Sequence, residues 1–154
     1  MACDRNNLIG KNGKLPWDIR EDWNYFLKTT YNGILIMGRH CYNEFEEHAK
    51  KREVIALSRN PDQHFPYAHK ASSLVESLQI AKNLGDNRTI WICGGNNIYK
   101  EALPLADRLY LTEIDAEYSG DIYLPAWDKH FTKEISSQTL QTSTTELTFR
   151  ILSK

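Results

Sequence analysis

Residues 33–45 read GILIMGRHCYNEF, and this stretch decides the fold. A short apolar run, from Gly33 to Met37, leads through Gly38, Arg39 and His40 into a short helix that we expect to start at Cys41. An apolar run of this length between turn residues is typical of a strand buried on both faces. The stretch therefore predicts a strand, a glycine turn and a helix.

The same succession recurs along the chain. Further apolar or alternating runs predict strands over residues 52–58 (REVIALS), 89–93 (TIWIC) and 108–114 (RLYLTEI). We expect helices to begin near Arg20, after a cap at Ser72, and at Asn97 behind Gly94 and Gly95. Glu76 then stands four residues after the predicted cap, one place beyond the capping-box position.

Strands that alternate with helices predict parallel pairing with helices on both faces of the sheet. The tail differs, because residues 131–138 and 146–152 form two strand patterns with no helix between them. We therefore expect one α/β domain over residues 1–154. Its three-layer mixed sheet would be mostly parallel, with an antiparallel C-terminal edge hairpin. Ligands of such sheets bind at the carboxyl ends of the strands.

The composition excludes several classes of protein. The 154 residues are 41% hydrophobic and 25% charged, with a formal net charge of −1, as in an ordinary soluble globular protein. That charge argues against nucleic acid or anionic membrane bound by bulk electrostatics. No apolar run of membrane-spanning length and no leader pattern is visible, so we expect a cytosolic protein. Three scattered cysteines and five scattered histidines suggest neither disulfides nor a metal site.

Two glycine turns point to a phosphate-bearing ligand. Residues 36–40 (IMGRH) and 92–96 (ICGGN) each join a strand to a helix, where free N–H groups can meet an anion. Arg39, His40, Ser58 and Arg59 add donors beyond the needs of a pyrophosphate, which favours NADP over NAD. The alternative is that these side chains are only solvated strand ends.

An acidic residue in an apolar stripe points to chemistry. In residues 10–26 (GKNGKLPWDIREDWNYF), Asp22 shares a predicted helix face with Ile19 and Phe26. A carboxylate there costs free energy unless it is paired or protonated, and such groups gather at functional sites. The alternative is that Asp22 merely belongs to the first helical turn, where acids are favoured.

Taken together, these motifs resemble a known family. GKLPWDIREDWNYF, ILIMGRHCYNEF, REVIALSRNP, CGGNNIYKEALPLADRLYLTEIDAEYSGD and LTFRIL are similar, in that order, to a bacterial dihydrofolate reductase. The similarity extends from about Ala2 to Leu152. It implies NADPH-dependent reduction of dihydrofolate by a protein that is commonly a monomer.

The resemblance also implies roles for individual residues. Asp22 would bind the 2-amino and N3 edge of the pterin and promote protonation of N5. Thr112 would brace the Asp22 carboxylate, and Trp17 would hold an ordered water near it. Arg52 would clamp the glutamate α-carboxylate. Substrate contacts would come from Ala2, Trp17, Asp22, Phe26, Arg52 and Thr112. Cofactor contacts would come from Ala2, Ile9, Gly10, Lys14, Leu15, Gly38, Arg39, His40, Cys41, Ser58, Arg59, Gly94, Gly95, Asn96, Asn97, Ile98 and Tyr99. Residues 8–14 would form a mobile loop that Asp121 pins through backbone N–H groups.

Some positions depart from the family pattern. The family's first strand begins about five residues before the position of Met1, so we expect that the true start lies upstream. Cys41 replaces a hydroxyl residue, which would weaken one phosphate contact, and residues 46–51 replace a Gly- and Pro-containing loop. We expect Cys93 to be a packing residue. Two alternatives stay open: a pteridine or riboflavin-pathway reductase on the same fold, which would not need Arg52, and a non-catalytic nucleotide- or folate-binding homologue.

Overall fold

The computed structural model describes residues 1–85 and 87–154. The chain divides into two compact units, which are described separately: a terminal unit (residues 1–26 and 103–154) and a central unit (residues 27–102). Within the described residues, no helix is long and apolar enough to cross a membrane.

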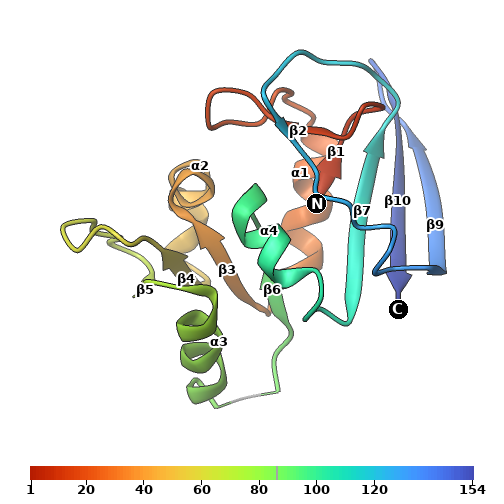
Figure 1. The fold of residues 1–154 in the computed structure, drawn as a ribbon. Helices are drawn as coiled ribbons and strands as arrows, with labels where there is room; N and C mark the ends of the chain where they lie inside the picture. The colour runs from red at the N-terminus through yellow and green to blue at the C-terminus, as the bar shows by residue number, and fades with distance from the viewer. Residues whose placement is uncertain (86) are drawn as a thin grey trace. The chain divides into compact units, whose positions relative to one another are not determined.

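In its described residues, the central unit is a four-stranded parallel sheet in the order β5-β4-β3-β6, with three helices (Figure 1). Its elements are β3 (Ile34–Gly38), α2 (Arg39–Ala49), β4 (Glu53–Leu57), β5 (His69–Ala71), α3 (Leu74–Asn83), β6 (Ile90–Ile92) and α4 (Asn96–Ala102). The buried run over β3 is confirmed, because all four residues from Ile34 to Met37 are at most 1% exposed.

The strand order explains why helices cover both faces of this sheet. The connection from β3 through α2 to β4 and the connection from β5 through α3 to β6 cross the sheet in opposite directions. Because such crossovers are right-handed, α2 and α3 lie on opposite faces. On the α3 face, Ile34 and Ile36 pack in one core with Leu74 and Ala81.

The terminal unit contains a four-stranded sheet in the order β1-β7-β10-β9 and a small antiparallel pair, β2 and β8. Its elements are β1 (Ala2–Cys3), β2 (Leu8–Gly10), β7 (Arg108–Ile114), β8 (Ile122–Tyr123), β9 (Lys133–Gln141) and β10 (Glu146–Ser153). Helix α1 (Arg20–Thr29) belongs to this unit up to Phe26. Strand β1 pairs parallel with β7, whereas β10 pairs antiparallel with both neighbours.

Two apolar clusters hold the terminal unit together. One gathers Cys3, Leu111 and Phe131, and the other gathers Trp17, Ile19 and Phe149. Strand β9 contributes to neither cluster and is exposed at every position except the half-buried Ser136. It forms the outer edge of the sheet (Figure 1).

The predicted mixed α/β class, with parallel strands first and an antiparallel C-terminal hairpin, is confirmed. Several boundaries were wrong. Helix α2 begins at Arg39 rather than Cys41, and β9 covers residues 133–141 rather than 131–138. The cap of α3 is Ser73, whose hydroxyl accepts the Glu76 N–H at 3.1 Å, so Glu76 occupies the capping-box position after all. That the whole chain folds as a single domain stays a prediction.

Candidate active site

Asp22 lies in the first turn of α1, half-buried. Burial raises the pKa of its carboxyl group, and a hydrogen bond with Thr112 acts in the opposite direction. The residue therefore lies in the first helical turn and is also partly shielded from water, as each sequence interpretation required, while its role in chemistry stays a prediction. A carboxyl group with a raised pKa keeps its proton to a higher pH than an exposed carboxyl group does, which suits it to a role in proton transfer.

Thr112 is fixed by the sheet around it. It lies on β7, is 3% exposed, and pairs with Ala2 of β1 on one side and Phe149 of β10 on the other. Its N–H donates to the Met1 carbonyl at 2.8 Å. The predicted contact between Thr112 and Asp22 is therefore present, on a rigid strand.

Trp17 precedes α1 and is 8% exposed. Its ring lies 5.4 Å from the Tyr118 ring, and its indole N–H has no partner among the described residues. A buried donor without a partner is costly, so this N–H is suited to a water or ligand acceptor. Phe26, the other predicted aromatic contact, is half-buried, with its ring 5.5 Å from that of Trp23.

The predicted mobile loop contains a tight turn. Lys11 and Lys14 exchange backbone hydrogen bonds of 2.8 and 3.0 Å. Between them, Asn12 and Gly13 have φ angles of 51° and 78°. Asn-Gly is the strongest short-range hairpin signal that a sequence can carry, yet this turn was not predicted. The Asp121 carboxylate accepts the Asn12 N–H at 3.1 Å, so the predicted Asp121 contact is present.

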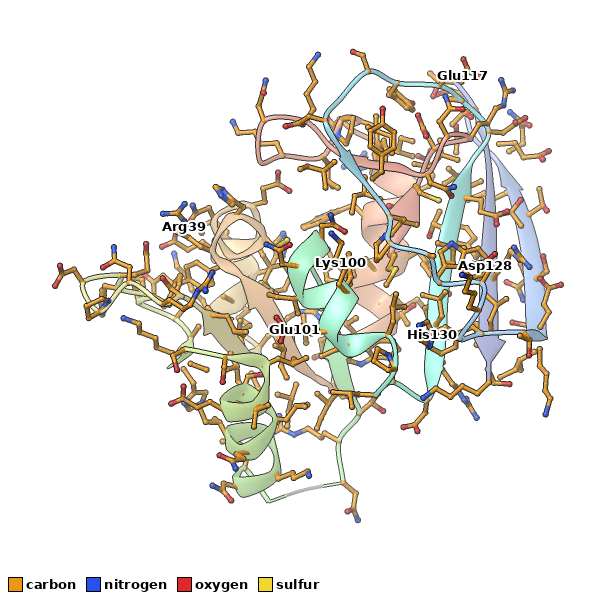
Figure 2. All side chains as sticks on the ribbon, in the orientation of Figure 1. Arg39, Lys100, Glu101, Glu117, Asp128 and His130 are labelled. Atoms are coloured by element: carbon orange, nitrogen blue, oxygen red, sulfur yellow. The ribbon has the colours of Figure 1, made fainter. Side chains whose placement is uncertain are left out.

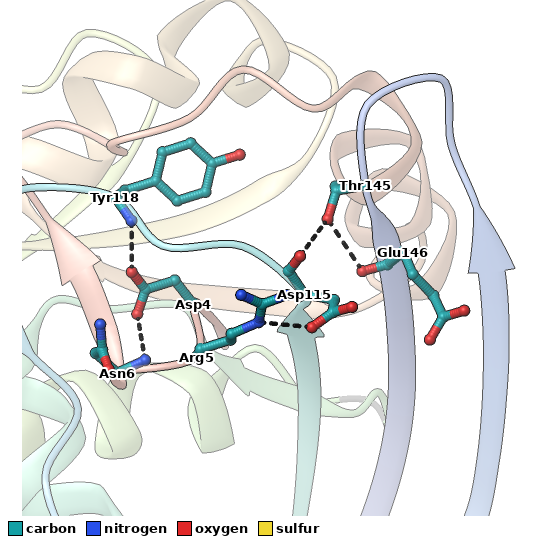
Figure 3. A network of polar contacts seen from close by, with 7 residues as sticks. All are labelled: Asp4, Arg5, Asn6, Asp115, Tyr118, Thr145 and Glu146. Atoms are coloured by element: carbon teal, nitrogen blue, oxygen red, sulfur yellow. Dashed lines mark hydrogen bonds and ion pairs between the residues drawn. The ribbon is translucent and has the colours of Figure 1, made fainter.

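A second carboxylate, which was not predicted from the sequence, holds the base of this loop. Asp4 is 3% exposed. Its Oδ1 accepts the N–H groups of Asn6 at 2.8 Å and Leu8 at 3.0 Å, and its Oδ2 accepts that of Tyr118 at 2.9 Å. Figure 3 shows that Asp4 thereby joins the turn after β1 to the segment after β7. A nearby ion pair, Arg5 with Asp115, is by contrast exposed.

In the central unit, the two predicted glycine turns are direct neighbours. The Gly38 N–H donates to the Gly94 carbonyl at 2.8 Å, and the Cys93 N–H donates to the Ile36 carbonyl at 2.8 Å. Gly94 has φ of 117° and leaves only 3.1 Å between an added Cβ and the Cys41 sulfur. Because β3 continues to β4 on one side and β6 lies on the other, this corner is the topological switch point of the sheet.

Groups that can meet an anion surround this corner. Helix α2 begins at Arg39, and its N-cap residue, Gly38, has no side chain, so its first N–H groups lack a side-chain cap among the described residues. Arg39, His40 and Arg59 are exposed, and Arg39 lies at the amino end of α2 (Figure 2). An added Cβ at Gly95 would meet nothing within 4 Å. The buried Oδ1 of Asn96 has no partner among the described residues, and as an acceptor it suits a hydroxyl or amide donor of a ligand and not the anion itself.

The Arg52 guanidinium donates hydrogen bonds to two neighbouring protein atoms. Its Nη1 donates to the Thr30 hydroxyl at 2.9 Å and its Nη2 to the Leu27 carbonyl at 2.7 Å. The Tyr31 and Phe45 rings lie 5.7 and 5.8 Å from the guanidinium carbon. Partial burial lowers the pKa of Arg52. No carboxylate pairs with it within residues 1–85 and 87–154.

The three cysteines are unpaired thiols. Burial raises the pKa of Cys41 to about 11 and that of Cys3 and Cys93 to about 12. They are therefore protonated at neutral pH, which fits the predicted packing role of Cys93. No group of three or more potential ligands for a metal ion occurs in the described part of the chain.

Comparison with known proteins decides the family. The family model described as dihydrofolate reductase matches residues 1–154. The chain belongs to the dihydrofolate reductase family. It is 35% identical to dihydrofolate reductase of Bacillus subtilis over 138 residues, which cover 90% of this chain and 80% of that protein. It is 38% identical to dihydrofolate reductase type 3 of Salmonella typhimurium over 124 residues, covering 80% of this chain and 75% of the relative.

A solved structure is similar along almost the whole chain. Dihydrofolate reductase from Enterococcus faecalis, complexed with NADP(H) and RAB-propyl, matches with a TM-score of 0.85 and 26% identity. The match covers 99% of this chain and 92% of that one. Family and fold, first inferred from the motifs, are thus confirmed, whereas the roles of the individual site residues stay predictions.

Proposed function

We propose that this protein reduces 7,8-dihydrofolate to 5,6,7,8-tetrahydrofolate with NADPH, by hydride transfer to C6 and protonation of N5. The observation that carries the proposal is the half-buried Asp22 carboxyl group, which Thr112 holds and whose pKa burial raises. Membership of the dihydrofolate reductase family supports the same reaction.

Asp22 is the acidic group that the pterin needs. A carboxylate that accepts hydrogen bonds from the 2-amino and N3 positions fixes the ring, and its negative charge favours the protonated form of N5. Such preorganised electrostatic effects typically contribute about 3 kcal/mol or more to lowering a barrier. The hydrogen bond with Thr112 helps to orient the carboxyl group, and the indole N–H of Trp17 remains available to a bridging water.

Arg52 is the group that favours a folate over a pterin without a tail. Its guanidinium is half-buried and has no carboxylate partner of its own in the described residues. An unpaired, partly desolvated guanidinium binds a carboxylate strongly through two parallel hydrogen bonds. The glutamate α-carboxylate of dihydrofolate would supply that partner. A riboflavin-pathway reductase would have no use for it.

The residues at the glycine corner fit NADPH. The uncapped start of α2 and the open space beside Gly95 would receive the phosphates. The unpartnered Asn96 oxygen would accept a hydrogen bond from a donor elsewhere on the cofactor, such as a ribose hydroxyl. Arg39 and Arg59 supply exposed cations suited to a 2′-phosphate. When bound, the nicotinamide supplies the hydride. The loop over residues 8–14, with Leu15, would exclude water from the reacting carbons.

The deciding experiment follows NADPH absorbance with and without dihydrofolate, for the wild type and Asp22→Asn. We expect turnover that needs dihydrofolate and falls about 10²- to 10⁴-fold in the variant. NADPH binding, measured by quenching of tryptophan fluorescence, should be unchanged. Turnover that survives Asp22→Asn would exclude the proposed role of Asp22. Binding of both ligands without turnover in the wild type would favour a non-catalytic homologue.

We also propose that the protein is a monomer, as members of this family commonly are. Sedimentation at micromolar concentration should give a single species near the chain mass of 17.9 kDa. A species of twice that mass would contradict this.

A further inference from the structure

We infer that Thr30 is a positioning residue that aims Arg52 at a carboxylate of the substrate, and so sets the preference for a substrate with a glutamate tail. The inference rests on the proposed function, because it concerns the residue that orients the clamp and not the clamp itself. It is carried by the hydrogen bonds of one side chain, Arg52, to two atoms at the end of α1.

Helix α1 ends at Thr29, and Thr30 follows it in the turn to β3. The Thr30 carbonyl accepts the Gly33 N–H at 3.0 Å, which closes the turn and fixes the Thr30 backbone. The side chain is 3% exposed. Its hydroxyl is therefore a rigid acceptor at a buried position and not a mobile surface group.

The Leu27 carbonyl belongs to the last turn of α1, where carbonyl groups lack partners within the helix and carry the negative end of the helix dipole. This carbonyl and the Thr30 hydroxyl accept from different nitrogens of the guanidinium, at 2.7 and 2.9 Å. Two acceptors on two nitrogens fix the plane of a rigid fork, whereas either one alone would let it rotate.

This arrangement leaves some N–H donors of the Arg52 guanidinium available to a ligand. A guanidinium has five N–H donors, and Arg52 donates two of them to protein atoms. The other three have no acceptor within residues 1–85 and 87–154. Tyr31 and Phe45 lie beside the guanidinium and reduce its contact with water, which strengthens a charge-assisted bond to the remaining donors.

Losing the Thr30 hydroxyl should therefore affect only the recognition of the tail. In Thr30→Val, whose shape is nearly the same, we expect KM for dihydrofolate to rise about tenfold, which equals about 1.4 kcal/mol. KM for 6-methyl-7,8-dihydropterin, which has no glutamate tail, should change less than twofold. Thr30→Ser, which keeps the hydroxyl, should restore most of the affinity for dihydrofolate.

Matched controls separate this effect from damage to the fold. Thr29→Val removes a hydroxyl one residue earlier that does not contact Arg52, and should leave both KM values unchanged. In an Arg52→Lys background, Thr30→Val should cause little further loss if Thr30 acts through Arg52. Should Thr30→Val fail to fold, Thr30→Ala provides the same comparison without added bulk.

Equal increases of KM for both substrates, or losses that add fully in the Arg52→Lys background, would overturn the inference while leaving the proposed function intact. A wild-type protein that reduces neither substrate would overturn the proposed function itself. Thr30→Ser that behaves like Thr30→Val would show that packing of the methyl group, and not the hydrogen bond, is what matters.

Discussion

Replacing Asp4 by asparagine tests how the base of the loop over residues 8–14 is held. The side chain keeps its size but loses its charge and one acceptor. Its carboxamide oxygen can still accept the N–H groups of Asn6 and Leu8, which Oδ1 accepts in the wild type. The amide nitrogen then faces the Tyr118 N–H, which Oδ2 accepts at 2.9 Å.

The expected cost follows from this one lost contact. A hydrogen bond to a charged acceptor contributes about 1.5–3 kcal/mol, and a donor facing another donor recovers none of it. We therefore expect Asp4→Asn to lower the free energy of unfolding by about 2 kcal/mol. The measurement is urea unfolding at pH 7, with the midpoint and slope obtained from tryptophan fluorescence.

Asp115→Asn is the matched control, because it removes a carboxylate from the same region (Figure 3). Asp115 pairs with Arg5 at 2.7 Å, but the two side chains are 56% and 53% exposed. Pairs as exposed as this contribute little to stability, because water screens their attraction and ordering both side chains costs entropy. If Asp4→Asn changed the stability no more than Asp115→Asn does, the reasoning from buried backbone donors would be refuted.

Three further predictions concern pH, cofactor choice and the loop turn. The Asp22 pKa is raised in the folded state, so stability falls as pH rises from the unfolded pKa, near 3.8, through the folded value. Asp22→Asn should therefore raise the melting temperature at pH 7 but not at pH 3; an equal gain at both would contradict this. Arg39→Ala should raise KM for NADPH about tenfold and that for NADH little, and steady-state kinetics that show parallel losses would exclude a 2′-phosphate contact. Gly13→Ala, at φ of 78°, should lower the unfolding free energy by about 1 kcal/mol, which urea unfolding would detect; no change would mean that the turn relaxes.

The sequence predicted the parts of the fold that depend on apolar burial. The short apolar run from Ile34 to Met37, bounded by glycines, favoured a buried strand, and both glycine turns fell at strand ends because the apolar runs end there. The contact between Asp22 and Thr112 came from the resemblance. No local pattern links two residues that lie ninety positions apart.

What the sequence did not reveal depends on tertiary contacts or on polar geometry. Strands β2 and β8 are three and two residues long, so they have no periodicity to detect. Helix α2 begins two residues before the predicted start at Cys41. Arg39 and His40 are polar and resemble loop residues in the sequence, but polar residues can also adopt a helical backbone. Asp4 and Thr30 were not singled out from the sequence, because the sequence does not reveal which side-chain oxygens become buried acceptors.

The exposed position of β9 has a consequence for handling the protein. Within the described residues this nine-residue strand pairs with β10 alone, so its other side presents a row of free amide and carbonyl groups. An exposed edge strand can pair with a strand of another molecule unless features such as charged side chains prevent it. Lys133 and Glu134 place opposite charges at its beginning, and serine, threonine and glutamine dominate the rest. Replacing both Lys133 and Glu134 by valine should therefore increase self-association of the protein when it is concentrated.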